Sequence, residues 1–236
     1  MIYDIIVIGG GPAGMTAAIK AKETAPSASV KLIDKNKKLG KKLYATGNGK
    51  CNIANTKLDL SCYSSANEFF PFQFVTTDSH NDVMDFFESL GVSSYDDNGY
   101  IYPASLQAST IVWALTDRLK ILGIENSTSE EVLSIKQGKD GTYIVDTDKG
   151  GYRTTQVILA PGGAAAPKLG GSDRVYRLLD DLNVRFVKPH PALCKLKCNE
   201  YISDMSGVRA KAVVRLMCDG EEYDHCLLYT SDAADE

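Results

Sequence analysis

The sequence has 236 residues, of which 44% are hydrophobic and 24% are charged, and this ordinary globular composition excludes disordered, collagenous and fibrous proteins. Its 26 Lys and Arg against 30 Asp and Glu give a formal net charge of −4, so we expect no nucleic-acid partner. No apolar stretch approaches the roughly 18 residues of a membrane span, and we therefore expect a cytoplasmic protein without one.

The chain begins with a predicted βαβ unit. A continuous apolar run over Tyr3–Ile8 predicts a strand that is buried on both faces of a parallel sheet. Glycine-rich residues 9–14 then lead into a helix that continues to Ala25, and a second buried strand covers Val30–Ile33. This order of elements is typical of an α/β nucleotide-binding domain.

The glycines between the first strand and the helix match a dinucleotide fingerprint, Gly9-x-Gly11-x-x-Gly14, with Asp34 twenty residues later. Gly9 permits a tight turn, Gly11 lets a pyrophosphate approach the backbone, and Gly14 lets the helix pack on the strand. Asp34 can accept hydrogen bonds from both ribose hydroxyls and would repel the 2′-phosphate of NADP. A glycine-rich turn in another α/β fold is the alternative.

Residues 35–55 are basic and rich in Gly and Asn, and we interpret them as too polar to lie in a core. They are either an ordered cofactor-binding loop or a solvated basic surface. Gly47 and Gly49 permit close backbone approach, and Lys41, Lys42 and Lys50 supply positive charge near a pyrophosphate or reduced flavin.

Further elements alternate along the rest of the chain. Periodicity predicts helices over Asp82–Leu90 (with caps at Ser79 or Asn81), Gln107–Leu122 and Arg174–Leu182, a strand over Gly99–Pro103, a β-meander of Glu131–Gln137, Thr142–Thr147 and Tyr152–Leu159, and late strands over Ala192–Cys198 and Arg209–Met217. The turn after Leu159 is expected to approach the cofactor opposite the fingerprint, which favours a flavin over nicotinamide. The fold class is therefore α/β: a Rossmann-like FAD-binding domain with a β-meander, followed by the start of a second, β-rich domain, which the resemblance described next implies to be an inserted domain.

Four segments together resemble the BaiN/RdsA-type family of FAD-dependent oxidoreductases. They are DIIVIGGGPAG over 4–14, GKKLYATGNGKCN over 40–52, VILAPGG over 157–163 and PHPAL over 189–193. The resemblance implies a glutathione-reductase-type FAD domain over residues 1–188. A β-barrel-like domain interrupts it, and residues 189–225 form the start of that domain.

The resemblance also implies which residues bind the cofactor. Gly9, Gly11, Pro12, Ala13 and Gly14 would hold the pyrophosphate, Asp34 the ribose, Val132 the adenine through its backbone, Thr46, Gly47, Asn48, Gly49 and Cys51 the flavin, and Ala160, Pro161 and Gly162 the opposite turn. Lys35, Lys41 and Lys42 complete the predicted cofactor-binding set. Pro161 departs from the A-T-G-G pattern of the family, because it lacks an N–H and a hydroxyl.

No catalytic acid or base can be named from the sequence. A dithiol relay with Cys51 would need a second Cys at position 46 or 56, and the sequence has Thr at both. Such a relay is therefore not expected, and a packing role is favoured for Cys51. Packing or structural roles are also favoured for His190, Cys194 and Cys198. The six Cys include no Cys-x-x-Cys pair, and we expect reduced thiols and no metal site.

The last eleven residues, Cys226–Glu236, resemble the translation of a transposon-based sequencing adapter. We expect them to be foreign and the native protein to continue beyond His225, so that this chain alone binds FAD poorly. The resemblance predicts hydride transfer between flavin N5 and a small organic substrate, with NAD(P)H as a candidate electron donor. A redox-sensing or structural flavoprotein, and a nicotinamide-only dehydrogenase, are the alternatives.

Overall fold

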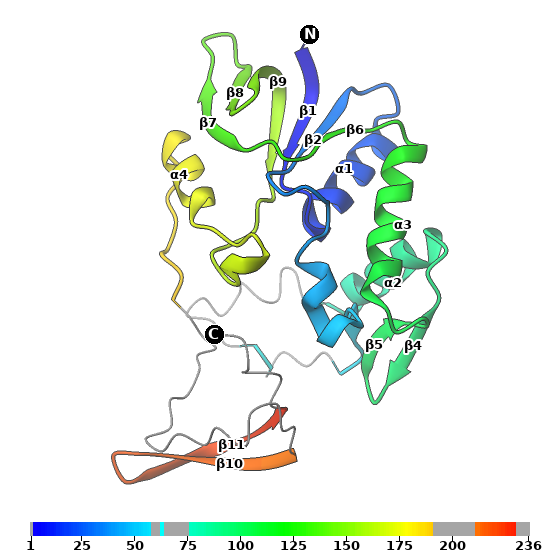
Figure 1. The fold of residues 1–236 in the computed structure, drawn as a ribbon, viewed down its shortest axis with the longest axis vertical. Coiled ribbons are helices and arrows are strands. Elements are labelled where there is room, and N and C mark those ends of the chain that lie inside the picture. Colours follow the sequence, from blue (N-terminus) through cyan, green and yellow to red (C-terminus); the bar gives the residue numbers. More distant parts are fainter. Residues whose placement is uncertain (1, 58–61, 64–75, 191–210, 230–236) are drawn as a thin grey trace. The chain divides into compact units, whose positions relative to one another are not determined.

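The computed structural model describes residues 2–57, 62–63, 76–190 and 211–229. The chain divides into two compact units, Met1–Pro189 and His190–Glu236. The first unit contains every element of the predicted nucleotide-binding domain and is described first (Figure 1).

A six-stranded mixed sheet forms the centre of the first unit, in the order β6-β2-β1-β9-β8-β7. Its strands are β1 (Ile2–Ile8), β2 (Val30–Ile33), β6 (Glu125–Ser127), β7 (Val132–Gln137), β8 (Tyr143–Thr147) and β9 (Gly150–Leu159). Strands β6, β2, β1 and β9 run parallel to one another, whereas β7 and β8 complete an antiparallel meander with β9. The predicted Rossmann-like α/β class with a meander is confirmed.

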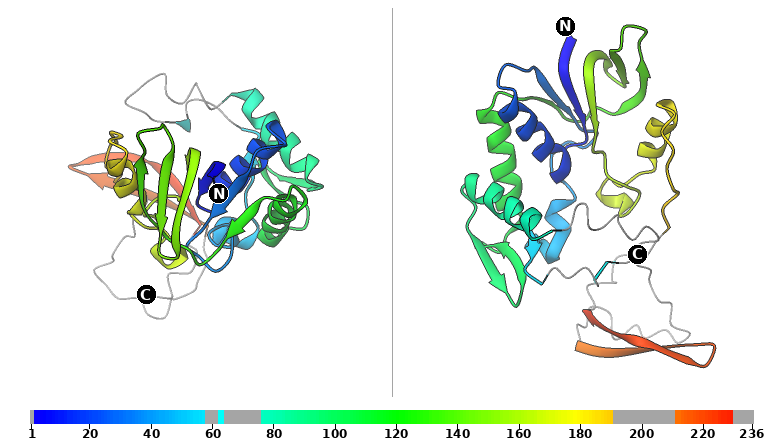
Figure 2. Two further views of the ribbon diagram at one scale, coloured as in Figure 1. Left: turned by 90° about the horizontal axis from the view of Figure 1, so that it is seen from above. Right: turned by 180° about the vertical axis from the view of Figure 1, so that it is seen from behind.

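Alternate residues of β1 and β2 enter two different cores, which explains why both strands are apolar throughout. Val7 and Leu32 pack against helices α1 (Pro12–Thr24) and α3 (Ala108–Ile121). Ile6 and Ile33 pack on the other face, among residues of the meander and helix α4 (Arg174–Asp181). Figure 2 shows α1 and α3 on one side of these strands and the meander with α4 on the other.

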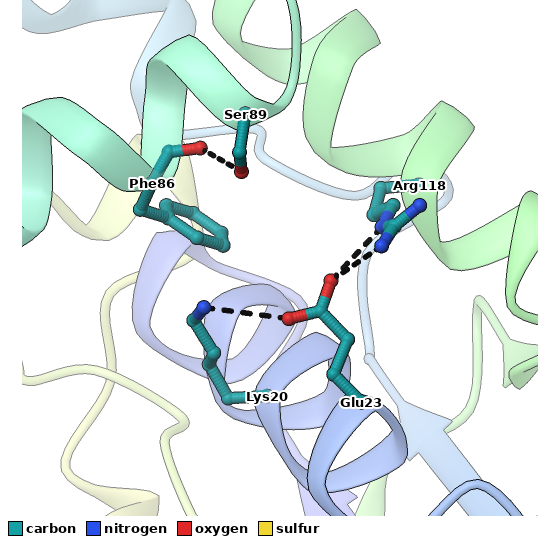
Figure 3. Close-up of polar contacts among 5 residues, drawn as sticks. All are labelled: Lys20, Glu23, Phe86, Ser89 and Arg118. Atoms are coloured by element: carbon teal, nitrogen blue, oxygen red, sulfur yellow. Dashed lines mark hydrogen bonds and ion pairs between the residues drawn. The ribbon is translucent and has the colours of Figure 1, made fainter.

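Three helices on the first face are joined by polar contacts at their edge (Figure 3). Glu23 of α1 accepts hydrogen bonds from Nε and Nη2 of Arg118 in α3, at 3.0 and 2.7 Å. Lys20 contacts Glu23 at 3.3 Å and lies over the ring of Phe86, in helix α2 (Thr77–Ser89). Burial opposes ionisation of Glu23, but the hydrogen bonds from Arg118 and Lys20 hold its pKa below the usual value.

Beside these helices lies a three-stranded antiparallel sheet in the order β3-β5-β4. Its strands are β3 (Ala54–Asn55), β4 (Ser94–Asp97) and β5 (Tyr100–Pro103). Two short 3-10 elements, η1 (Leu43–Gly49) and η4 (Pro167–Leu169), complete the unit.

Three details differ from the sequence-based predictions. Helix α2 begins at Thr77, five residues before the predicted start, because Thr76 and Ser79 form a reciprocal capping box. The short strands β3, β4 and β6 were not predicted. The interpretation of residues 35–55 as too polar for the core is wrong in part, because Leu39, Leu43 and Cys51 are buried in the core on the helical face.

In the second unit the structure describes an antiparallel hairpin of β10 (Lys211–Cys218) and β11 (Glu221–Tyr229). Asp219 and Gly220 join the strands with positive φ angles of 53° and 85°, as in a tight hairpin turn. The strand predicted at Ala192–Cys198 lies outside the described residues. The domain boundary near 188 and the foreign origin of residues 226–236 stay predictions.

Candidate functional site

The candidate site lies where four parallel strands end side by side. The N–H of Gly9 donates to the carbonyl of Ile33, and the N–H of Ala160 donates to the carbonyl of Ile8, both at 2.8 Å. The N–H of Asp34 donates to the carbonyl of Ser127 at 2.8 Å. In open α/β sheets ligands bind at this carboxyl edge, so the fingerprint, Asp34 and the turn after β9 meet where the sequence predicts a ligand.

Two fingerprint glycines are required by close backbone packing. Gly9 has a φ of +106°, and a Cβ there would overlap the carbonyl oxygen of Ala160. A Cβ on Gly14 would overlap the carbonyl oxygen of Gly9. The turn after β9 therefore lies directly against the fingerprint, which only glycine permits at these two positions.

Gly11 differs from these two glycines, because a Cβ there would meet nothing within 4 Å. Gly11 is the N-cap of α1, yet no side chain caps the helix and its first turn contains no acidic residue. The first N–H groups of the helix are thus left without side-chain acceptors, and the helix dipole favours an anion at this end.

A cavity of about 520 Å³ opens in front of this helix end, a size typical of ligand pockets. We call it the fingerprint cavity. Its lining includes Gly10, Gly11, Pro12, Ala13, Asp34, Asn36, Lys41, Lys42, Ala160, Pro161, Gly162, Leu169 and Gly170. Of the predicted pyrophosphate-binding residues, Gly11, Pro12 and Ala13 line this cavity with the opposite turn and two lysines that can balance the charge of a phosphate, whereas Gly9 and Gly14 do not line it.

A second cavity of about 50 Å³ adjoins it and is called the nucleoside cavity here. Its lining includes Gly9, Ile33, Asp34, Lys35, Asn36, Glu130, Glu131, Val132, Pro161, Gly170, Ser172, Arg174 and Leu178. Asp34, Asn36, Pro161 and Gly170 line both cavities, so the two lie side by side at the edge of the sheet, and we call the pair the groove. Val132 and Asp34 lie at the end where the sequence predicts the adenosine.

Asp34 is fixed at the junction of the two cavities and is only 9% exposed. Its Oδ2 accepts from the N–H of Gly10 and its Oδ1 accepts from the N–H of Asn36, each at 2.6 Å. Each carboxylate oxygen keeps a second lone pair. The side chain is therefore held where it can still accept hydrogen bonds from a ribose, and that role stays a prediction.

The three predicted lysines contact residues 163–172, which we call the strap. Lys35 Nζ donates to Ser172 Oγ at 3.0 Å, and Lys41 Nζ donates to the carbonyl of Lys168 at 3.1 Å. Lys42 Nζ donates to the carbonyl of Ala165 at 2.8 Å. The lysines thus lie at the groove, as predicted, but their present partners belong to the chain itself.

The predicted flavin-binding residues Thr46–Cys51 lie apart from both cavities, since none of them lines either one. This segment is exposed between the buried anchors Leu43 and Cys51. Asn48 and Cys51 have left-handed φ angles of 54° and 61°, which cost conformational energy in residues with a Cβ. Such strain is typical of functional segments, but the structure does not test contact of this segment with a flavin.

Cys51 behaves as a packing residue. Its side chain is 4% exposed, and burial raises the pKa of the thiol although the Thr46 hydroxyl opposes that shift. A neutral thiol is a poor nucleophile. His190 is exposed, and Cys194 and Cys198 lie outside the described residues. Among the described residues no cluster of three His, Cys, Asp or Glu side chains is arranged to hold a metal ion.

Sequence reasoning missed several residues that line the groove. They are Asn36, Glu130, Glu131, Leu169, Gly170, Ser172 and Arg174. Asn36 and Glu131 are sequence neighbours of the predicted residues Lys35 and Val132, and that proximity was the available signal. Within the described part of the chain, no helix is long and apolar enough to cross a membrane.

Comparison with known proteins gives consistent matches. The profile of the HI0933-like protein Rossmann domain family matches residues 3–222. A 3-dehydro-bile acid delta(4,6)-reductase of Clostridium scindens is 32% identical over 209 residues, which are 88% of this chain and 51% of that protein. A ribosomal RNA dihydrouridine synthase of Escherichia coli is 25% identical over 233 residues, which are 97% of this chain and 57% of that protein.

The chain therefore spans about half the length of these curated relatives. Among solved structures, FrdA of E. coli quinol fumarate reductase superposes with a TM-score of 0.51 at 18% identity, over 70% of this chain and 33% of that one. At this identity the match shows a shared fold.

Proposed function

The chain belongs to the HI0933-like Rossmann domain family, as its motifs predicted, and we propose that it forms the nucleotide-binding part of an FAD-dependent oxidoreductase. The observation that carries this proposal is the groove at the carboxyl edge of the sheet. It combines a helix N-terminus without a side-chain cap, two lysines and a fixed carboxylate within one connected space. These are the chemical groups that a dinucleotide requires.

We assign the residues of the groove to the parts of an adenine dinucleotide in a defined order. The first N–H groups of α1, together with Lys41 and Lys42, would hold the pyrophosphate, and Asp34 would hold the ribose. The adenine would lie beside the backbone of Val132 in the nucleoside cavity, which Leu178 also lines. When bound, FAD supplies hydride transfer at its N5 position.

Two relatives suggest a substrate class. Their names describe reduction of a delta(4,6) unsaturated 3-dehydro-bile acid and formation of dihydrouridine in ribosomal RNA. In both cases a hydride and a proton add across a ring double bond that is conjugated with a carbonyl group. We propose that the whole protein reduces such a double bond, with NADH or NADPH as the source of the electrons.

A small-molecule substrate is the first candidate, because the bile-acid reductase shares the higher identity with this chain. Ribosomal RNA is the second, because the dihydrouridine synthase matches 97% of the chain. The absence of a nucleic-acid partner therefore stays a prediction based on net charge alone.

Two measurements test this proposal. Flavin absorbance of the chain after gel filtration with FAD measures cofactor binding, which the sequence predicts to be weak for these residues alone. Anaerobic stopped-flow mixing of the complete coding sequence's product with NADH or NADPH, followed by a steroid 4-en-3-one or a uridine-containing RNA, measures electron transfer. A bound flavin that neither accepts nor donates electrons would favour a redox-sensing or structural role, and extraction of nicotinamide alone would favour a dehydrogenase.

A further inference from the structure

The strap, residues 163–172, is a compact loop whose ends meet. The N–H of Ser172 donates to the carbonyl of Gly163 at 3.2 Å. Inside the loop, the N–H groups of Leu169, Gly170 and Gly171 donate to carbonyls of Ala166, Pro167 and Ala166, at 3.0, 2.9 and 3.1 Å. These four amides are protected by hydrogen bonds within the strap, so their exchange with solvent measures how often the strap opens.

The strap crosses the groove where the two cavities join. Leu169 and Gly170 line the fingerprint cavity, and Gly170 and Ser172 line the nucleoside cavity. At the crossing, Gly170 lies so close to the side chain of Asn36 that a Cβ on it would fall 2.7 Å from Asn36 Oδ1. The nucleoside cavity beneath this crossing holds about 50 Å³, far less than an adenosine needs, so the groove must widen before a nucleotide enters.

Three lysine side chains from one stretch, residues 35–42, donate hydrogen bonds to the strap. Two of them, Lys41 and Lys42, donate to backbone carbonyls of the strap and also line the fingerprint cavity. A phosphate oxygen is a stronger acceptor for an ammonium group than a neutral carbonyl. A pyrophosphate in this cavity would therefore compete with the strap for the same two donors.

We propose that the strap is a gate that a pyrophosphate opens: Lys41 and Lys42 leave the carbonyls of Lys168 and Ala165 for the phosphates and thereby release the strap. The gate rests on the proposed function, because it assumes that a dinucleotide binds in the groove. It makes the groove selective, since adenosine carries no phosphate to draw the lysines away. Asn36, Gly170 and Ser172 become part of the nucleotide site.

Hydrogen exchange of the four internal strap amides, at residues 169–172, tests the gate on the whole chain without any flavin. In the free protein, Lys42→Met removes one charge-assisted hydrogen bond and is expected to speed this exchange about 3- to 10-fold. Lys139→Met, at an exposed turn between β7 and β8, is the matched control and should leave the exchange unchanged. Adding ADP to the wild-type chain should speed the exchange by a similar factor, whereas adenosine should not.

Each other outcome has a definite meaning. Unchanged exchange in Lys42→Met would show that Lys42 does not hold the strap closed, and would overturn the gate. Slower exchange with ADP would overturn the gate, because the strap would then close over the nucleotide instead of opening. The same effect from adenosine as from ADP would also overturn it, because opening would then not depend on a phosphate. Calorimetry with ADP up to millimolar concentration, which also detects weak binding, separates the two proposals. ADP that binds without changing strap exchange overturns the gate alone. ADP that does not bind even at this concentration overturns the proposed function together with the trigger of the gate.

Discussion

The two walls of the groove differ in what holds them. The fingerprint wall is fixed by backbone: β1 pairs with β2 and β9 on either side, and Gly9 lies against the carbonyl of Ala160. The strap wall is held across the groove by lysine side chains that reach over from residues 35–42. The difference teaches that one site can combine a rigid surface, which sets the geometry of a ligand, with a second surface that costs little to displace.

The largest effect is expected from breaking the fixed wall. Gly14→Ala places a methyl group on the carbonyl of Gly9, and we expect it to lower the free energy of unfolding by about 3 kcal/mol or more. Gly11→Ala is the matched control, since its methyl group meets no atom within 4 Å; it should change stability by less than about 1 kcal/mol. It should still weaken ADP binding. Chemical denaturation and calorimetry measure both, and equal stability of the two variants would refute the fixed wall.

A smaller effect is expected in the sheet beneath that wall. Lys31 in β2 is 2% exposed, forms an ion pair with Glu125 of β6, and lies 4.7 Å from the ring centre of Tyr152. Glu125→Gln leaves the buried ammonium without a counter-charge. We expect a loss of about 2 kcal/mol, below the value for a fully buried pair because Glu125 is half exposed. Adding Lys31→Met should recover most of the loss in urea unfolding, and no recovery would contradict this account.

The same cluster gives the sheet a dependence on high pH. Burial, followed by the hydrogen bond from the Tyr3 hydroxyl to Glu125, raises the pKa of Tyr3 from 10.0 to about 12. Folding therefore favours the neutral phenol, so this stabilisation is complete below pH 10 and is lost as the pH rises through 12. We expect a loss of about 1 kcal/mol across this range. Tyr3→Phe should flatten the plot of melting temperature against pH over this range. An unchanged slope would exclude Tyr3 as the source of the pH dependence.

The smallest effect is expected near the strap. Arg174 in α4 pairs with Glu131 at 3.2 Å, but the two side chains are 29% and 35% exposed. Partly solvated pairs contribute little, so Arg174→Met should cost less than about 1 kcal/mol. Thermal melting in low and high salt measures this, with Arg174→Lys retaining the charge. A loss above 2 kcal/mol would show that this side of the groove is as rigid as the fingerprint wall.

Much of the fold could be predicted because its signals are local. The continuous apolar runs of β1 and β2 indicate strands that are buried on both faces. The spacing from Gly9 to Asp34 indicates the glycine turn and the helix that join these strands. Strand β6 carries no such signal, since Glu125–Ser127 is polar and pairs only with β2. The role of Glu125 depends on Lys31, 94 residues away in the sequence.

The site was predicted in the same uneven way. Residues within the fingerprint could be assigned because their spacing alone fixes their geometry. The contacts of Lys41 and Lys42 with the strap join residues more than 120 positions apart, and no sequence pattern indicates that approach. Burial of Leu43 and Cys51 was also not predicted. Most of their sequence neighbours are polar and exposed, so no apolar pattern indicates that these two side chains enter the core.

The pairing of β1 with β9 has a consequence for synthesis of the chain. Ile2 lies beside Arg153, so β1 lacks one neighbour until about 150 further residues have been translated. At roughly 5–20 residues per second this delay is about 8 to 30 s. During that time an apolar strand has one unpaired edge, which invites wrong pairing. The nascent fingerprint, which follows this strand, can reach its native turn only after Ala160 has emerged.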